Sequence, residues 1–271
     1  MTSARRLILK LLLAADDEVT SARGLVRGCA LLGASENSTR IALARLSAAG
    51  LIESAGRGLY RLGPKARGLA RDVARWRSGE ARVRSWGGDW LLVHTGALGR
   101  SDRAALRQRE RALALLGLRE LERGLYLRAD NLSEPLEQTR LRLQALGLEP
   151  DALVCRASNF DKDTAARAQN LWPVQDLQQS YTRQIERMQQ WSRQAVALDA
   201  EDAAREAYQI GDAAIRQLVF DPLLPDQWID THLRADFTAA TLQFDALGHA
   251  IWQRLSVQPA DRIAPAQIRL Q

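Results

Sequence analysis

Cysteine and the residues that build metal sites are scarce in this sequence. Only Cys29 and Cys155 occur among 271 residues, too few and too far apart for a disulfide framework. His94, His232 and His249 do not share zinc-ligand spacing with either cysteine. The sequence also lacks a phosphate-binding loop, a dinucleotide-binding glycine motif and a nucleophile elbow. These absences predict a protein that is not an enzyme, keeps both cysteines reduced and uses no metal or cofactor.

Long hydrophobic runs are missing as well. The early apolar stretch Leu7–Ala15 is interrupted by Lys10. It is far shorter than the ~20 apolar residues that a membrane-spanning helix needs. It also carries no small-residue cleavage site of the kind that ends a secretion signal. We therefore expect a cytoplasmic protein that does not bind a membrane.

The charge of the chain is distributed unevenly. The whole sequence has a net charge of +6. Residues 1–87 contain 16 Lys and Arg against 7 Asp and Glu, a net charge of +9. Residues 88–271 contain 22 against 25, a net charge of −3. A local excess of positive charge favours a polyanionic partner, although a solubilising surface has the same composition.

The first 63 residues show the pattern of a winged helix-turn-helix, in which helices joined by a turn are followed by a β-hairpin called the wing. Apolar periodicity predicts a helix over residues 3–15. Ser21 and Ser35 are positioned to cap a second and a third helix. The third helix is predicted to run to about Ala49. Two short strands around Ala55–Gly58 then form the wing.

The rest of the chain changes from mixed to helical patterns. Residues 87–158 read as strand–helix–strand–strand–helix–strand, the order of a ferredoxin-like unit, and helical patterns follow Asn159. The sequence therefore predicts an α+β, mostly helical protein with an N-terminal winged helix-turn-helix, a central ferredoxin-like βαββαβ domain and a C-terminal helical domain. The predicted parts are a DNA-binding domain at 1–63, a helical linker at 64–86, the central domain at 87–158, a C-terminal domain for dimerisation and ligand binding at 159–256, and a tail at 257–271.

The predicted third helix has two chemically different faces. By helical periodicity one face is suited to packing and carries Thr39, Ala42, Leu43, Leu46 and Ala49. The other face combines polar groups near the helix start with small residues and flanking arginines: Asn37, Ser38, Arg40, Ile41, Ala44, Arg45 and Ala48. Amides and hydroxyls read base edges, small residues allow close approach, and arginines reach phosphates or guanine. A solvated face would more usually carry Glu and Lys. We therefore predict DNA contacts by this face.

Two basic features follow the third helix. Arg57 lies at the tip of the wing between two glycines, where it is suited to a minor groove or a phosphate; an ordinary exposed turn residue is the alternative. The predicted linker carries a basic ladder that suits either nonspecific attraction to DNA or a solvated face: Lys65, Arg67, Arg71 and Arg75. Gly79 interrupts this linker and marks either a hinge or a helix end.

Five motifs occur in order along the chain. The first is GASENSTRIALARLSAAGLIES at residues 33–54. The other four are Trp86-Gly87-Gly88-Asp89-Trp90; Leu116-Gly117-Leu118 with Gly124-Leu125-Tyr126-Leu127; Leu171-Trp172-Pro173-Val174 with Leu177 and Tyr181; and Phe220-Asp221-Pro222-Leu223-Leu224-Pro225. On these motifs the chain resembles the PaaX-like regulators, the repressors of phenylacetate degradation, over nearly its whole length. It departs from their pattern at Leu118, where phenylalanine is usual, and at Arg82-Val83-Arg84, a reduced form of a basic-isoleucine-tyrosine element.

The resemblance implies a function and partners. It implies a homodimeric transcription repressor that binds double-stranded, palindromic operator DNA. It also implies release by an acyl-CoA effector, an aryl-CoA thioester such as phenylacetyl-CoA. The residues themselves offer apolar and cationic candidates for an acyl-CoA site but no fingerprint of one. A DNA-binding architectural or adaptor protein without a small-molecule ligand therefore stays open as the alternative.

Overall fold

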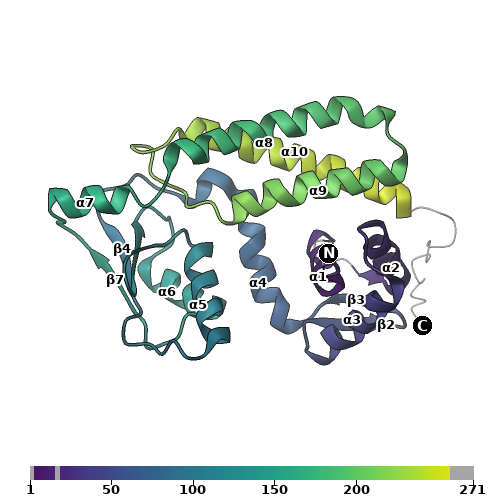
Figure 1. Ribbon diagram of the computed structural model, residues 1–271, viewed down its shortest axis with the longest axis horizontal. Helices are drawn as coiled ribbons and strands as arrows, with labels where there is room; N and C mark the ends of the chain where they lie inside the picture. Colours follow the sequence, from purple (N-terminus) through teal and green to yellow (C-terminus); the bar gives the residue numbers. More distant parts are fainter. Residues whose placement is uncertain (1–2, 16–18, 257–271) are drawn as a thin grey trace, which may run out of the picture. The chain divides into compact units, whose positions relative to one another are not determined.

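Helices make up most of the chain. In the computed structural model, which describes residues 3–15 and 19–256, 62% of the residues are helical and the strands form two small antiparallel sheets (Figure 1). The predicted mostly helical α+β class is confirmed at this level. The predicted tail lies outside the described residues. The chain divides into two compact units: unit 1 holds the described parts of 1–70, 192–211 and 243–271, and unit 2 holds 71–191 and 212–242.

The N-terminal module of unit 1 consists of three helices and a three-stranded sheet. The helices are α1 (Ala4–Ala14), α2 (Ala22–Leu31) and α3 (Glu36–Ala48). The strands are β1 (Thr20–Ser21), β2 (Ile52–Gly56) and β3 (Leu59–Leu62), in the antiparallel order β1-β3-β2. The three helices and the hairpin agree with the sequence patterns. Strand β1 was not predicted, because two residues are too short to show any periodicity.

Serine caps define where two of these helices begin. Ser21 Oγ accepts a hydrogen bond from the Gly24 amide at 2.9 Å, and Ser35 Oγ accepts one from the Ser38 amide at 3.2 Å. Each cap satisfies one of the unpaired N–H groups of the first helical turn. Both predicted caps are confirmed. They fix the start of α3, and so decide which of its residues face inwards.

The core of the N-terminal module is a single apolar cluster. It takes side chains from all three helices and from the sheet, among them Leu7, Ile8, Leu12, Leu25, Cys29, Leu43, Leu46, Ile52 and Leu62. The sheet approaches the end of α3 so closely that a Cβ at Gly63 would lie 2.4 Å from the Gly50 carbonyl oxygen. Only glycine fits at this crossing. The packing holds α3 in one orientation.

Parts of two C-terminal helices complete unit 1. A short 3-10 helix, η2 (Ala195–Ala197), precedes α9 (Ala200–Val219), and α10 (Thr231–Ser256) is the last helix described. Arg205 Nε donates to the Leu31 carbonyl at 3.2 Å, and His249 Nε2 lies 2.8 Å from the Ala14 carbonyl oxygen. Tyr208 packs against the apolar cluster. The N-terminal module therefore packs on later helices through pairs of residues that are 174 and 235 positions apart in the sequence.

Unit 2 contains a four-stranded sheet. Its elements follow in the order β4 (Trp90–His94), α5 (Arg103–Leu115), β5 (Arg119–Glu122), β6 (Leu125–Ala129), α6 (Leu136–Leu146) and β7 (Leu153–Ala157). The strands pair antiparallel in the order β5-β6-β4-β7, with Leu92 of β4 opposite both Leu127 and Cys155. Helices α5 and α6 lie side by side on one face of the sheet (Figure 1). The strand–helix–strand–strand–helix–strand order agrees with the predicted one.

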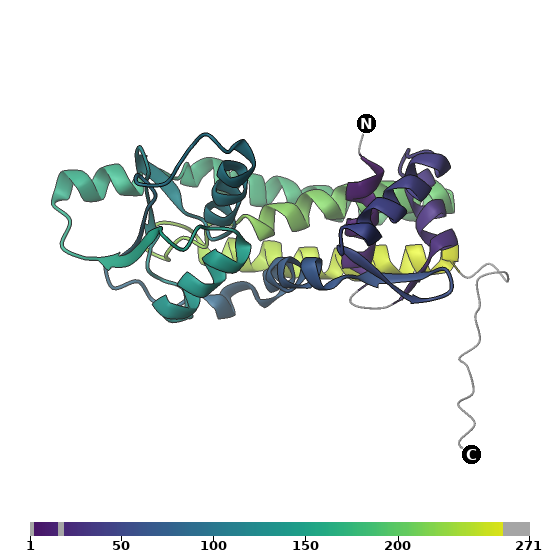
Figure 2. The same cartoon turned by 90° about the horizontal axis from the view of Figure 1, so that it is seen from below.

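Four further helices lie outside the two modules described so far. They are α4 (Pro64–Ala74), the 3-10 helix η1 (Arg75–Arg82), α7 (Lys162–Gln169) and α8 (Val174–Gln194) (Figure 2). Within unit 2, α8 packs on α10 through the stacked rings of Tyr181 and Phe237, whose centroids are 5.3 Å apart. None of the helices described in residues 3–15 and 19–256 is long and apolar enough to cross a lipid bilayer.

A buried polar network holds the turn between α9 and α10. Arg128 is 2% exposed and donates to the carbonyl oxygens of Leu116 and Ala129 and to Asn131 Oδ1, at 2.5, 2.9 and 2.7 Å. Asn131 Nδ2 in turn donates to the Leu223 carbonyl at 2.8 Å. Burial lowers the pKa of Arg128 to about 9, and repulsion by the charge of Arg142 adds to this shift. The turn is thus held by a buried charge whose hydrogen-bond acceptors are neutral oxygens.

Asp221 stabilises the same turn from its other side. Its Oδ1 accepts from the Leu223 amide at 2.8 Å, and it also accepts from the Tyr181 hydroxyl. Leu223 has a φ of +49°, which is rare for a residue with a side chain. Burial raises the pKa of the Asp221 carboxyl. The aspartate-proline-leucine motif at 221–223 therefore has a structural role in this turn.

Candidate nucleic-acid interface

The inward face of α3 follows the predicted pattern with one exception. Thr39, Ala42, Leu43 and Leu46 are buried. Ala49 was predicted on this face but is exposed, because α3 ends at Ala48 and Ala49 is only its C-cap. The chain leaves the helical path directly after Ala49, at Gly50 with φ +71°, so no further turn of α3 follows. The inward face is one turn shorter than predicted.

The outward face of α3 is solvent-exposed along its length. Every candidate residue on it is exposed: Asn37, Ser38, Arg40, Ile41, Ala44 and Arg45. Ile41 is an apolar side chain with 45% of its surface exposed. Arg45 makes no ion pair within the described residues. The face thus presents an amide, a hydroxyl, small residues and an unpaired guanidinium.

Arg40 has a partner on its own helix. Its Nη2 lies 2.6 Å from Glu36 Oε1, and its Nε donates to the same oxygen at 3.0 Å. Both side chains are more than half exposed, so this pair contributes little and is easily exchanged for another anion. Glu36 was not predicted as part of this surface, although its spacing of four residues from Arg40 is the signal for such a pair. Glu36 puts one negative charge on the face.

The tip of the β2–β3 hairpin presents Arg57. This residue is exposed between Gly56, with φ +146°, and Gly58, with φ +69°. Residues with side chains rarely adopt either conformation, so the two glycines allow the tight turn that projects Arg57. Arg57 makes no ion pair among the residues that the structure describes. Its place at an exposed tip agrees with the sequence pattern.

Only part of the predicted basic ladder is available to contact a polyanion. Glu53 of β2 pairs with Arg61 at 2.7 Å and also binds Arg67. Within unit 2, Arg75 pairs with Glu134 at 2.8 Å. Lys65 and Arg71 are exposed. Half of the ladder therefore stabilises the fold, which the sequence alone does not reveal because the acidic partners are distant in the chain.

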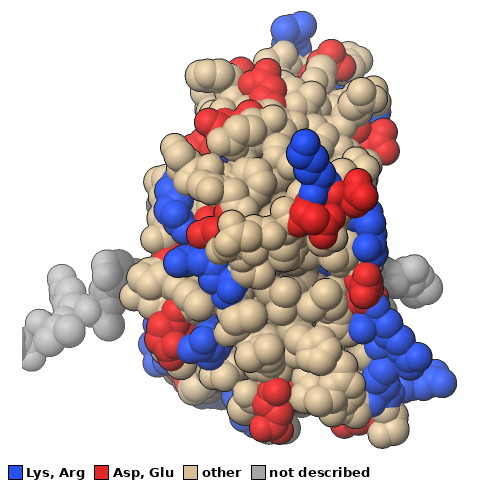
Figure 3. Space-filling model, turned by 90° about the vertical axis from the view of Figure 1, so that its left-hand side faces the viewer, with Lys and Arg blue, Asp and Glu red and all other residues tan. Residues whose placement is uncertain are grey.

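Unit 2 neutralises several of its arginines internally. Arg142 pairs with Asp72 and Glu134, at 2.5 and 2.9 Å, and Arg234 pairs with Glu80 at 2.6 Å. Figure 3 shows a face of the molecule on which acidic and basic side chains are interspersed, apart from Lys and Arg gathered along one edge. The exposed, unpaired arginines on α3 and at the hairpin tip differ from these paired ones. They are available to a polyanion.

Comparisons with known proteins match this chain to a family model and to solved structures. Residues 172–254 match the family model of the PaaX-like protein C-terminal domain. A solved structure, that of an uncharacterized protein from Mycobacterium tuberculosis, is 24% identical, with a TM-score of 0.60 over 94% of this chain and 99% of that chain. This likeness shows a shared fold. No curated protein sequence matches the chain. The family match includes the motifs at 172–181 and 220–225.

Proposed function

This chain carries a PaaX-like C-terminal domain, and from that premise we propose that it is a cytoplasmic, DNA-binding transcription repressor of an aromatic-compound catabolic operon of the phenylacetate type. Its effector is an aryl-CoA thioester such as phenylacetyl-CoA. The observation that carries the DNA-binding function is the outward face of α3, which is exposed and combines Asn37, Arg45 and small residues. Such a face suits a major groove.

The proposal assigns a role to each part of the chain. The module from α1 to β3 is a winged helix-turn-helix with α3 as its recognition helix. The sheet order β5-β6-β4-β7 with two helices on one face supports a ferredoxin-like central domain. Residues 159–256 form the helical domain for dimerisation and ligand binding. Asn37, Ser38, Arg40, Ile41, Ala44 and Arg45 contact bases or phosphates, and Arg57 contacts a minor groove or a phosphate. A homodimer then places two α3 helices in successive major grooves, ~34 Å apart.

Packing in unit 1 supports a route for release. The N-terminal module contacts α9 through Arg205 and α10 through His249, and both helices belong to the PaaX-like domain. A ligand that changes the packing of these helices changes the surroundings of the module. The segment Pro64–Trp86 is a second route, because Gly79 has φ +46° and ψ −127° and interrupts its helical path. A ligand acts on DNA binding only by favouring a dimer of different spacing or tilt.

The first prediction concerns salt. The affinity of the full chain for a labelled duplex of random sequence should fall linearly in a plot of log affinity against log salt concentration, because each phosphate contact releases counterions. Arg45→Ala and Arg57→Ala should each reduce the slope by about 1. Fluorescence anisotropy at a series of salt concentrations measures both effects.

Arg123→Ala serves as the matched control for these two variants. Arg123 is exposed at the β5–β6 turn in unit 2, so its removal changes the net charge by the same amount. Its slope should equal that of the unmodified chain. An affinity that does not respond to salt would exclude DNA as the partner. Equal slopes for all three variants would show that α3 and the hairpin are not the binding surface.

The second prediction separates a ligand-released repressor from an architectural or adaptor protein. A thioester that weakens DNA binding tenfold must itself bind tenfold more weakly to the DNA complex, about 1.4 kcal/mol of coupling. Titrating phenylacetyl-CoA into the free protein and into the complex, by calorimetry, measures both sides of this cycle. Free coenzyme A is the control for binding through the nucleotide alone. Equal affinities in the two titrations would favour the adaptor function.

A further inference from the structure

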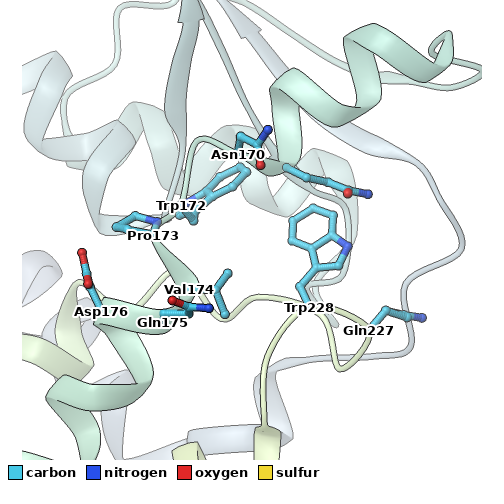
Figure 4. Close-up of a pocket in the computed structure, with 9 residues that line it drawn as sticks. Asn170, Trp172, Pro173, Val174, Gln175, Asp176, Gln227 and Trp228 are labelled. Carbon is cyan, nitrogen blue, oxygen red and sulfur yellow. The ribbon is translucent and has the colours of Figure 1, made fainter.

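A cavity of about 600 Å³ lies in unit 2, where the end of α7, the start of α8 and the loop before α10 meet. Nine residues line it: Gln169, Asn170, Trp172, Pro173, Val174, Gln175, Asp176, Gln227 and Trp228. Figure 4 shows the rings of Trp172 and Trp228 next to each other in this lining. Their centroids are 5.9 Å apart. The cavity volume is within the range of small-molecule sites.

Trp228, one of the two tryptophans that line the cavity, is packed against further aromatic rings. Trp228 packs on Trp86 and Trp90, with centroids 4.8 and 5.5 Å away, and Trp90 stacks on Phe160 at 5.6 Å. Each ring is thus fixed by another ring. A preformed aromatic surface favours an aromatic ligand, since little side-chain freedom is lost on binding.

One buried donor at this wall has no acceptor. Trp172 is 3% exposed, and its Nε1 makes no hydrogen bond within the described residues. A buried N–H without an acceptor is unfavourable, and most such groups in proteins are paired. The first amides of the 21-residue helix α8, those of Val174, Gln175 and Asp176, also donate to no other described residue. The site therefore offers donors that a ligand oxygen can use.

The charge of the lining limits the ligand further. None of the nine residues is Lys or Arg, and four of them carry carboxamides. The single carboxylate, that of Asp176, lies at the opposite end of the lining from Trp228 in Figure 4. An anion would gain no side-chain counter-ion here, and the Asp176 carboxylate in the first turn of α8 offsets the positive end of the helix dipole. A neutral carbonyl, by contrast, matches both the N–H donors and the carboxamides.

We infer that this cavity binds a small, uncharged aromatic carbonyl compound, whose ring stacks on the half-buried Trp228 and whose oxygen accepts hydrogen bonds from Trp172 Nε1 and the start of α8. The site is independent of the N-terminal module. Ligand binding to the cavity can be measured on the full chain without DNA. A failure of this inference is therefore distinguishable from a failure of the proposed DNA-binding function.

Three probes test the two chemical requirements. Benzamide has both the ring and the neutral carbonyl, cyclohexanecarboxamide lacks the aromatic ring, and benzoate replaces the amide by a charge. Calorimetric titration of each into the full chain should give benzamide about tenfold tighter binding than either of the others, the size of one lost interaction of about 1.4 kcal/mol. Equal affinities for the three compounds would overturn the inference, as would the absence of benzamide binding.

A pair of variants tests the role of the buried donor. Trp172→Phe keeps an aromatic ring but removes the N–H, and should weaken benzamide binding about 5- to 10-fold, as expected for one hydrogen bond. Trp252→Phe is the control, because Trp252 Nε1 already donates to the Ala204 carbonyl at 3.1 Å and Trp252 belongs to unit 1 and does not line the cavity. It should retain the affinity. Circular dichroism establishes that both variants are folded. Equal affinities of the two folded variants would overturn the assignment of Trp172 as a ligand donor.

Discussion

Leu46→Asp is expected to unfold the N-terminal module and to abolish DNA binding. Leu46 is 1% exposed in the apolar cluster formed by α1, α2, α3 and the sheet. A carboxylate placed there has no cationic partner in the cluster, which costs about 3–5 kcal/mol or more. That is a large part of the total stability of a domain, about 5–15 kcal/mol. Loss of helical signal in circular dichroism, and of a thermal transition, measures the effect.

Ala44→Asp is the matched variant on the same helix. Ala44 is exposed on the outward face, so the same carboxylate should destabilise the module by only about 0.5–1 kcal/mol, mainly through the lower helix propensity of Asp. It should nevertheless weaken DNA binding, because it sets a negative charge against the phosphates. A folded Ala44→Asp variant with unchanged DNA affinity would mean that another face of α3 meets the DNA. A stable Leu46→Asp variant would mean that the inward face is assigned wrongly.

Arg128→Met is expected to destabilise unit 2 by about 3 kcal/mol. Methionine keeps the length of the side chain but leaves the Leu116 carbonyl and Asn131 Oδ1 without their donor, at about 1–3 kcal/mol for each buried acceptor. The burial that lowers the pKa of Arg128 to about 9 shows that the charge itself is unfavourable there, so its removal offsets part of the loss. Urea unfolding followed by tryptophan fluorescence reports the change, since the aromatic cluster lies in the same unit.

Arg119→Met controls for the chemical change itself. Arg119 is exposed on β5, so its replacement should alter stability by less than about 0.5 kcal/mol. Equal stability of Arg128→Met and the unmodified chain would show that the cost of burying the guanidinium cancels its hydrogen bonds. In that case the turn at 221–225 would be held by Asp221 rather than by Arg128.

Local patterns in the N-terminal module were sufficient to predict its elements. Ser21 and Ser35 cap their helices as expected, and the buried positions of α3 follow a 3.6-residue period as far as Leu46. These features depend on residues three or four positions apart, so the sequence contains both partners of each contact. The same argument explains the Arg40–Glu36 pair, a local contact that could have been predicted and was not. The candidate DNA-binding residues were identified by this local reasoning and await the salt experiment.

Contacts between distant segments were not predictable in the same way. Nothing near residues 64–75 indicates that Arg67 is held by Glu53 or Arg75 by Glu134. Likewise, the contact of Arg205 with Leu31 joins residues 174 positions apart. The domain boundaries predicted at residues 63, 86, 158 and 256 stay a prediction. Unit 1 instead combines the N-terminal module with segments of the C-terminal helices, because parts of α9 and α10 pack on that module although they are distant in the sequence.

The sequence by itself determined the order of the longer elements up to residue 158, the division of α3 into a buried and an exposed face, and the surplus of positive charge in residues 1–87. All of these follow from the hydrophobic periodicity of the sequence and from its composition. Only the tertiary structure decided which arginines are neutralised and which are exposed. Only it brought Trp172 and Trp228 to one cavity and left an indole N–H there without an acceptor. The physical reason is that burial and pairing depend on neighbours from distant segments, whose positions no local pattern specifies.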